Sequence, residues 1–385
     1  MKNCAEVVII GGGVVGLSIA YHLGEMGYGD VVVLEKDHIG FGSTGKCAGG
    51  IRQQFSTELN IKLSMESVKF FENFEKITGI SADFHQNGYL LLAINENEFN
   101  CLRKNLELQH KLGLKVYLLS SKEIKEIIPH LAIEDVFGAT YCPTDGFADP
   151  SSVIQGFASC ARRYGVKIYE ETKAVGIEFI QEGRIKKIHT TRGDIETPKL
   201  VNAAGPYAGE VGNMMGLYIP VHPLRRHIFF TEPYDMAESK FPMVIDFHTG
   251  FWFRKEGSGF IFGMRNPKEK EGFDTSVDWD FLTDTLAYVA IQRFPPFADL
   301  GIQNAWAGLH ADTPDFQAIL GEVPGMEGVY LACGFSGHGF MHSPAVGKVM
   351  AQLISEKEPF IDVSSLSIDR FKKNSSKSQR EKIFI

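Results

Sequence analysis

The stretch that decides the fold reads VVIIGGGVVG and covers residues 7–16. Its four apolar residues predict a buried strand, and the glycines after them have the spacing G-x-G-x-x-G. Gly11 permits a tight turn out of the strand, Gly13 lets the backbone approach a pyrophosphate, and Gly16 lets the following helix pack closely on the strand. Free amides at the start of that helix would face the phosphates. The stretch therefore predicts a β-α-β unit that holds a dinucleotide.

The sequence after this turn supplies the context that the motif requires. A helical segment leads to a second apolar run at residues 31–34, and Glu35 follows at the tip of that strand. An acid at this distance accepts hydrogen bonds from a ribose diol. The alternative is a tight turn between strand and helix that binds nothing, and the context favours the dinucleotide.

Length, charge and composition limit the class of protein. The chain has 385 residues, more than one hydrophobic core usually supports, so two domains are expected. A net charge of −8 argues against a nucleic-acid surface. We expect no transmembrane segment and no signal peptide, and hence a cytoplasmic protein. The six cysteines lack C-x-x-C spacing, which indicates reduced thiols and no metal site.

The apolar pattern divides the chain into two kinds of segment. In one kind, a strand is followed by a turn of small residues and then by a helix. The other kind has strand-like runs broken by Pro and Gly, as in antiparallel sheets. The first kind covers 1–84, 146–217 and 310–365, and the second covers 85–145 and 218–309. We expect a discontinuous α/β domain of the Rossmann type with an inserted antiparallel β domain flanked by helices, and a site in the crevice between them.

Helix signals and the end of the chain complete this outline. The apolar spacing over 57–77 predicts one long helix. Asp149 before Pro150 predicts another that runs to about Tyr164, because an N-cap acid before a first-turn proline favours a helix start. Residues 366–385 are expected to form a C-terminal tail, in which the stretch from Lys372 through Lys382 is a solvated end and not a binding arm.

Several motifs, taken in order, resemble those of the flavin-dependent amine oxidoreductases grouped with D-amino acid oxidase, glycine oxidase and sarcosine oxidase. Among these, the chain most resembles the β subunits of heteromeric sarcosine oxidase and dye-linked L-proline dehydrogenase. The resemblance covers almost the whole chain. The blocks that carry it are residues 11–16, 34–36, 42–44 with 49–55, 145–150, 202–205, 313–315 and 334–341.

The resemblance implies a Rossmann-type FAD-binding domain with an inserted substrate domain. The adenosine of FAD would lie on the first β-α-β unit, with Val175 holding the adenine through its backbone, and the isoalloxazine ring would reach the crevice. Amides of the turn 337–341 would meet the negative charge of the reduced flavin. The implied cofactor-binding residues are Gly11, Gly13, Val14, Val15, Gly16, Glu35, Lys36, Gly42, Ser43, Thr44, Gly49, Gly50, Ile51, Val175, Ala203, Ala204, Gly205, Gly308, Gly337, His338, Gly339, Phe340 and Met341.

Arg52 matches the arginine that pairs with the substrate carboxylate in the sarcosine-oxidising relatives. A guanidinium fork suits a carboxylate because it donates two parallel hydrogen bonds. The alternative is a surface arginine in a loop, and Arg225, Arg226 and Arg265 are rivals for the same role.

Other positions matter for catalysis or depart from the family pattern. His338 is expected to be a positioned hydrogen-bond donor near the flavin, or simply a packed histidine. Gly308 and Asp149 stand where relatives attach flavin covalently, so the FAD is expected to be non-covalent. Ile261 stands where sarcosine oxidase has the lysine that promotes reaction with oxygen, which favours a dehydrogenase. Met341 replaces a lysine that contacts the carboxylate in monomeric enzymes and leaves the substrate open.

These features predict oxidation of a small amino acid or N-methyl amino acid, with proline or sarcosine favoured. Hydride would pass to flavin N5, and the resulting imine would hydrolyse. One alternative is an electron-transferring subunit whose partner carries FMN or an iron-sulfur cluster, with Cys47 facing that partner. Others are a glycine or D-amino acid oxidase that produces hydrogen peroxide, and an NAD-dependent dehydrogenase. The segments 40–54 and 334–341 argue against NAD.

Overall fold

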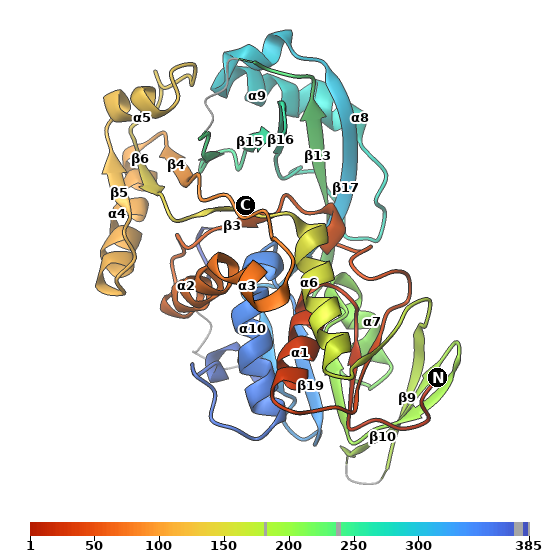
Figure 1. Ribbon diagram of the computed structural model, residues 1–385. Helices are drawn as coiled ribbons and strands as arrows, with labels where there is room; N and C mark the ends of the chain where they lie inside the picture. Colours follow the sequence, from red (N-terminus) through yellow and green to blue (C-terminus); the bar gives the residue numbers. More distant parts are fainter. Residues whose placement is uncertain (181–182, 236–239, 373–379, 384–385) are drawn as a thin grey trace.

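The apolar run at the start of the chain forms β1 (Val7–Ile10), which lies inside a six-stranded sheet (Figure 1). The computed structural model describes residues 1–180, 183–235, 240–372 and 380–383. Neighbouring strands of this sheet are parallel, except that the edge strand β18 is antiparallel to β19. In sheet order, the strands are β18 (Ile319–Glu322), β19 (Val329–Cys333), β12 (Lys199–Asn202), β1, β2 (Val31–Leu34) and β8 (Lys167–Tyr169).

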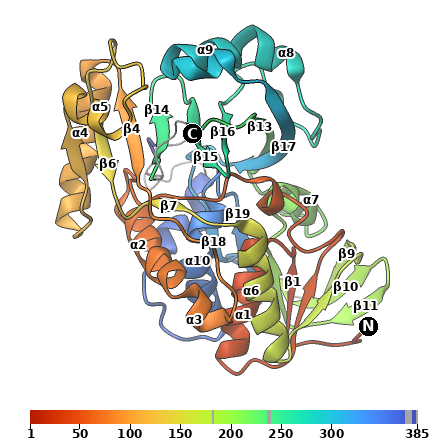
Figure 2. The ribbon, with the colours of Figure 1, turned by 45° about the horizontal axis from the view of Figure 1, so that its top comes forward.

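Both faces of this sheet are covered, which explains its continuous apolar strands. Val7 and Ile9 belong to the core formed with the helices, whereas Val8 and Ile10 belong to the core on the opposite face, formed with a three-stranded sheet. Figure 2 shows the helices and the small sheet on opposite sides of β1. The elements concerned are α1 (Val14–Glu25), α6 (Pro150–Arg163) and α10 (Gly339–Ile354) on one face, and β9 (Ala174–Phe179), β10 (Ile185–Thr190) and β11 (Gly193–Glu196) on the other.

A second sheet of eight strands lies above the first in Figure 1. Most of its neighbours are antiparallel, as expected, but β4 and β14 pair in parallel. The exception has a physical reason: these two strands come from separate insertions, so no hairpin turn fixes their relative direction. In sheet order, the strands are β17 (Ile302–Asp312), β13 (His222–Thr231), β16 (Gly259–Gly263), β15 (Trp252–Glu256), β14 (Met243–Asp246), β4 (Tyr89–Ala93), β6 (Gly138–Cys142) and β5 (Tyr117–Leu119).

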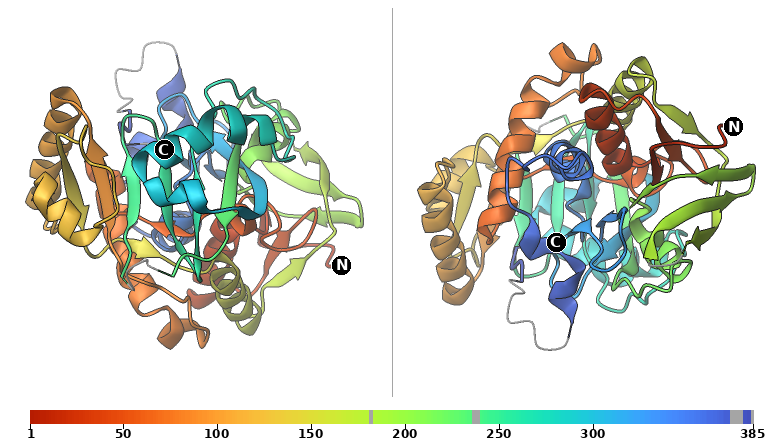
Figure 3. Two further views of the ribbon diagram at one scale, coloured as in Figure 1. Left: turned by 90° about the horizontal axis from the view of Figure 1, so that it is seen from above. Right: turned by 90° about the horizontal axis from the view of Figure 1, so that it is seen from below.

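Helices α8 (Trp279–Phe281) and α9 (Ala287–Arg293), joined by a π-helical turn, cover the outer face of this sheet, as the left view of Figure 3 shows. The core beneath them is rich in phenylalanine, including Phe253, Phe260 and Phe294. Along β4, Leu90 and Leu92 face this core, whereas Tyr89 and Leu91 belong to a separate cluster. The alternation of a strand therefore assigns Tyr89 to the other face of the sheet.

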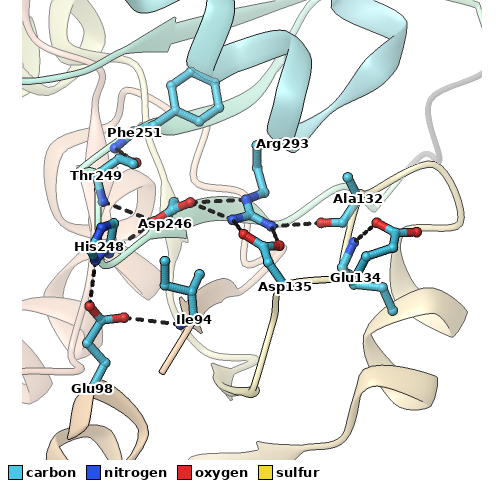
Figure 4. Close-up of polar contacts among 11 residues, drawn as sticks. Ile94, Glu98, Ala132, Glu134, Asp135, Asp246, His248, Thr249, Phe251 and Arg293 are labelled. Atoms are coloured by element: carbon cyan, nitrogen blue, oxygen red, sulfur yellow. Dashed lines mark hydrogen bonds and ion pairs between the residues drawn. The ribbon is translucent and has the colours of Figure 1, made fainter. Parts of the chain in front are cut away.

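A buried network fastens the seam between the two insertions (Figure 4). Arg293 of α9 donates to Asp246 at the end of β14, from Nε at 3.0 Å and from Nη2 at 2.8 Å. The same guanidinium pairs with Asp135 at 2.8 and 2.9 Å, and it also donates to the carbonyl of Ala132. One side chain thus joins segments that lie far apart in the sequence.

The helix over 57–77 is interrupted. The structure has α2 (Glu58–Glu72) and α3 (Phe74–Thr78), with Asn73 between them in a non-helical conformation. The Asn73 side chain donates to the carbonyl of Lys69, and asparagine competes in this way with helical hydrogen bonding.

The predicted start of α6 is confirmed, because Asp149 accepts a hydrogen bond from the Ser152 amide at 2.7 Å. The remaining α-helices and strands in the described part of the chain are the long α4 (Glu96–Lys111) and the short elements α5 (Ser121–Ile127), α7 (Ala208–Asn213), β3 (Gly50–Ile51) and β7 (Gly146–Phe147).

The expectation of a solvated end is wrong for Glu381, whose side chain is fully buried, as is that of Ile383 in the same C-terminal tail. Their partners lie near residue 56, more than 300 residues away, so no local pattern indicates this burial. The rest of the expected tail includes 373–379 and 384–385, which lie outside the described residues. None of the helices in the described part of the chain has the length and apolar character needed to span a bilayer.

Candidate functional site

A connected cavity of about 450 Å³ extends between the two large sheets, from Glu35 to Arg52 and Tyr89. It brings together residues from nearly every sequence block that carries the family resemblance. The predicted residues that line it are Gly11, Gly13, Val14, Val15, Glu35, Lys36, Gly42, Ser43, Thr44, Gly49, Gly50, Arg52, Ala203, Ala204, Gly205, Gly308, Gly337, His338, Gly339, Phe340 and Met341.

One end of the cavity has the geometry that a dinucleotide requires. Gly11 has φ of +119°, and a Cβ there would lie 2.3 Å from the Ala203 carbonyl oxygen, so only glycine fits. Helix α1 starts directly after Gly13, which has no side chain to cap it, and the Val14 amide of its first turn donates to Thr44 Oγ1 at 3.2 Å. The Glu35 carboxylate is already held by the amides of Gly12 at 2.8 Å and Asp37 at 2.9 Å. A carboxylate accepts about four hydrogen bonds, so Glu35 keeps capacity for a ribose diol.

The other end is formed around the start of α10. Gly337 has φ of +88°, and a Cβ there would come within 2.6 Å of the His310 ring. The helix begins at Gly339 without a side-chain cap, and residues 337–341 line the cavity. Backbone amides at a helix start stabilise negative charge. These residues therefore fit the reducible end of a flavin as well as the first end fits its nucleotide.

Arg52 follows β3 and is held by a buried loop. β3 pairs with β7, and Asp145, just before β7, accepts hydrogen bonds from the Gln53 amide at 2.8 Å and the Gln54 side chain at 3.2 Å. Burial raises the pKa of the Asp145 carboxyl to about 6. This carboxyl therefore joins the sequence blocks 49–55 and 145–150 in space, and each block fixes the position of the other.

The guanidinium of Arg52 is only 2% exposed and lies over the ring of Phe55 at 4.2 Å. Nη1 donates to the Gln54 carbonyl at 2.5 Å, and Nη2 donates to the Ile383 carbonyl at 2.8 Å. Among the residues that the structure describes, no carboxylate forms an ion pair with Arg52. Burial lowers the pKa of this guanidinium. The cation thus lines a cavity without a carboxylate of its own.

His338 lies beside this arginine, with Nε2 at 3.4 Å from Arg52 Nη2. Burial and the neighbouring cation hold the pKa of His338 well below its usual value, so the ring is neutral. Because Arg52 can only donate, Nε2 of His338 is the acceptor and Nδ1 carries the proton. A donor role of His338 toward the cofactor stays a prediction, and Nδ1 is the atom that would perform it.

Two of the three rival arginines have internal carboxylate partners. Arg225 pairs with Glu269 at 3.2 Å and Asp274 at 2.7 Å. Arg226 pairs with Asp312 at 3.2 Å, and burial lowers its pKa. Arg265 lines the cavity. The comparison favours Arg52 over Arg225 and Arg226 as the cation available to an anionic ligand.

Three predicted residues do not line the cavity: Gly16, Ile51 and Val175. A Cβ at Gly16 would lie 2.0 Å from the Gly11 carbonyl, so this glycine serves the packing of helix on turn. Ile51 is fully buried in β3, and Val175 is half exposed in β9. Their contact with a cofactor stays a prediction, and for Val175 the neighbouring residues 172–174 line the cavity instead.

Sequence reasoning missed the residues that the eight-stranded sheet contributes to the cavity: Tyr89, Met243, Ile245 and Trp252. They carry no motif, and only the inward face of their strands selects them. The hydroxyl of Tyr89 has no hydrogen-bond partner among the described residues and lies against Gly50, where a Cβ would approach it to 2.0 Å. Burial raises the pKa of the Cys47 thiol, which also lines the cavity, to about 11. This thiol therefore stays protonated.

A dinucleotide-binding sheet with a second sheet over its cavity defines the class of two-domain, nucleotide-dependent oxidoreductases. Residues 6–353 match the family model described as FAD dependent oxidoreductase, and the chain belongs to this family. It is therefore an enzyme, and FAD is its cofactor.

Solved and curated relatives agree with this assignment. The crystal structure of L-proline dehydrogenase from P. horikoshii superposes with a TM-score of 0.90 and 36% identity, covering 96% of this chain and 98% of that one. The FAD-dependent oxidoreductase domain-containing protein 1 of Bos taurus is 32% identical over 95% of this chain and 85% of its own length. Mitochondrial sarcosine dehydrogenase of Mus musculus is 29% identical over 96% of this chain, which spans only 42% of that relative.

Proposed function

We propose that the chain oxidises a small amino acid or N-methyl amino acid, with proline or sarcosine favoured, and passes the electrons on as a dehydrogenase. The observation that carries the proposal is the buried guanidinium of Arg52, which lines the cavity without a carboxylate partner among the described residues. When bound, FAD supplies the hydride acceptor. A similarity to proteins named for proline and sarcosine supports the substrate class.

In this proposal the protein positions the substrate and performs little acid-base chemistry. Arg52 would donate charge-assisted hydrogen bonds to the carboxylate from its remaining N–H groups, since Gln54, Ile383 and His338 already accept from it. The Tyr89 hydroxyl would donate a further hydrogen bond. Met243, Ile245 and Trp252 would exclude water around the carbon that loses hydride. His338 is neutral, so it adds no charge that would compete with Arg52 for the carboxylate.

The test is the variant Arg52→Ala in the FAD-loaded protein. The loss of a charged, hydrogen-bonded contact should weaken substrate binding by on the order of 2–5 kcal/mol and appear in KM. Arg225→Ala is the matched control, because Arg225 is paired with Glu269 and Asp274. An unchanged KM for both proline and sarcosine in Arg52→Ala would contradict the carboxylate role.

The choice of dehydrogenase over oxidase has its own test. Ile261 is a buried apolar residue of β16 and offers no charge to stabilise developing superoxide. Turnover with an artificial dye should far exceed peroxide formation in air. Comparable rates would favour the alternative, an oxidase that produces hydrogen peroxide.

Two further properties are part of the proposal. Non-covalent FAD is supported because Gly308 has no side chain and the Asp149 carboxylate caps α6, so acid precipitation should release all of the flavin. A partner subunit with FMN or an iron-sulfur cluster is the alternative electron route, and the elution volume and visible spectrum of the native protein test it. The cytoplasmic location stays a prediction, since several relatives have mitochondrial names.

A further inference from the structure

Residues 380–383, here called the anchored segment, are fastened at the start of α2 by a buried carboxylate. Glu381 is fully buried, although a charged side chain is rarely so unless it is paired or hydrogen-bonded. Its oxygens accept five hydrogen bonds, from Ser56 N at 2.9 Å, Ser56 Oγ at 2.6 Å, Thr57 Oγ1 at 3.2 Å, Asn60 Nδ2 at 2.9 Å and Ile383 N at 3.0 Å. Such complete satisfaction fixes the segment in one place.

This anchor lies two residues before a contact with Arg52. The Ile383 carbonyl accepts from Arg52 Nη2 at 2.8 Å, while the Gln54 carbonyl holds Nη1. The Phe55 ring supports the face of the same guanidinium. Glu381 also favours the charged form of Arg52 electrostatically, against the burial that lowers the pKa. Both Nη atoms of Arg52 are therefore hydrogen-bonded to a carbonyl. One of these two carbonyls, that of Ile383, belongs to the anchored segment.

The side chain of Ile383 packs behind the wall of the same cavity. It is fully buried and belongs to the apolar cluster that includes Tyr89, Leu91, Met243 and Ile245. Three members of this cluster, Tyr89, Met243 and Ile245, line the cavity beside Arg52. A smaller residue at 383 would remove volume from behind this wall.

We propose that the anchored segment is part of the substrate site. Glu381 is a positioning residue that aims the Arg52 fork through the Ile383 carbonyl, and Ile383 limits the size of the substrate side chain that the cavity accepts. The inference rests on the proposed carboxylate role of Arg52. Its physical basis is that a guanidinium whose orientation is fixed before the ligand arrives presents its remaining N–H groups to a carboxylate without a further cost of ordering.

The first experiment measures binding of two probes to the FAD-loaded protein by the change in the flavin absorbance spectrum. Pyrrole-2-carboxylate carries the charge that Arg52 would recognise, and pyrrole-2-carboxamide is its neutral counterpart. Glu381→Ala should weaken the carboxylate by about tenfold or more and the carboxamide by less than about twofold. Lys382→Ala is the matched control, because Lys382 is exposed in the same segment. It should bind both probes as the parent does.

The second experiment measures specificity. Ile383→Ala keeps the backbone carbonyl that holds Arg52 but removes side-chain volume, so the ratio of kcat/KM for N-methylleucine over sarcosine should rise by about tenfold. This variant also remains informative if Glu381→Ala fails to fold. Flavin content and melting temperature of each variant show whether the fold is retained.

The outcomes separate the inference from the proposed function. If Glu381→Ala binds both probes like the parent, or weakens them equally, the positioning role is wrong. An unchanged specificity ratio in Ile383→Ala would refute the size limit. If Arg52→Ala itself binds pyrrole-2-carboxylate normally, the carboxylate role of Arg52 fails first, and that result does not depend on the anchored segment.

Discussion

Two buried arginines show how differently one side chain is used in the two parts of this molecule. Arg293 at the seam of the eight-stranded sheet has two carboxylate partners, Asp246 and Asp135 (Figure 4). Burial disfavours its charge, but the hydrogen bonds that it donates to these carboxylates, and their negative charges, outweigh that effect and raise its pKa. Arg52 in the cavity is bonded to neutral carbonyls, and burial lowers its pKa.

The difference separates a structural role from a binding role. A buried cation with its own carboxylates is electrostatically complete and fastens the chain to itself. A buried cation that is hydrogen-bonded to carbonyls and has no ion-paired carboxylate has its geometry fixed, which is what the proposed binding of an anionic ligand requires. The same measurements on both arginines therefore test whether this distinction is real.

The largest effect is expected for Arg293→Met. Removal of this cation leaves the Asp246 carboxylate buried without compensation, so the unfolding free energy should fall by about 3–5 kcal/mol. Denaturant titration measures it. In the double variant Arg293→Met/Asp246→Asn, more than half of the loss should be recovered, because the buried charge is gone. If Arg293→Met were as stable as the parent, the structural role of Arg293 would be wrong, and so would its contrast with Arg52.

Arg52→Met should destabilise the protein less, by about 1–2 kcal/mol, because the acceptors left behind are neutral carbonyls and not an ionised carboxylate. The same denaturant titration applies. At the same time, pyrrole-2-carboxylate binding should be largely lost, whereas Arg293→Met should leave it intact in the folded protein. If the two variants lost equal stability, Arg52 would be as structural as Arg293.

A smaller effect is expected for Tyr89→Phe, which removes a cavity-lining hydroxyl that has no partner among the described residues. The affinity for pyrrole-2-carboxylate should fall by about 0.5–1.5 kcal/mol, the usual value of one hydrogen bond. Tyr141→Phe is the control, since its hydroxyl donates to the Asn87 carbonyl at 3.2 Å and does not line the cavity. Equal affinity in Tyr89→Phe and the parent would show that the hydroxyl does not contact the ligand.

The smallest effect concerns pH. Burial, and then Arg52, lowers the pKa of His342 to about 3, and His338 is likewise neutral. The Asp145 carboxyl, which also interacts with Arg52, has a pKa of about 6 and is ionised well above that pH. Between pH 7.5 and 8.5 neither this carboxyl nor the two histidines change charge, so the dissociation constant of pyrrole-2-carboxylate should vary by less than about twofold. Below about pH 6.5 the unfolded chain binds protons that these folded histidines do not, so the unfolding free energy should decrease as the pH falls. A steep change in affinity near neutral pH would indicate a protonated histidine at the site.

Much of the cofactor end could be predicted from sequence. Gly11, Gly13 and Glu35 act within one β-α-β unit, where spacing along the chain fixes spacing in space. The substrate end could be predicted only in part. Arg52 was identified by a motif, but Tyr89 was not, because its role depends on which face of β4 turns inward.

The sequence by itself determined the nucleotide cradle, since a turn that requires positive φ and a helix start with free amides are properties of adjacent residues. Only the tertiary structure decided which arginine is compensated and which is open to a ligand. The partners of Arg293 come from two segments, at residues 132–135 and at Asp246, and a partner of Arg52 lies at residue 383. Electrostatic compensation depends on distances in space between residues far apart in the chain, and these distances exist only after both sheets have packed.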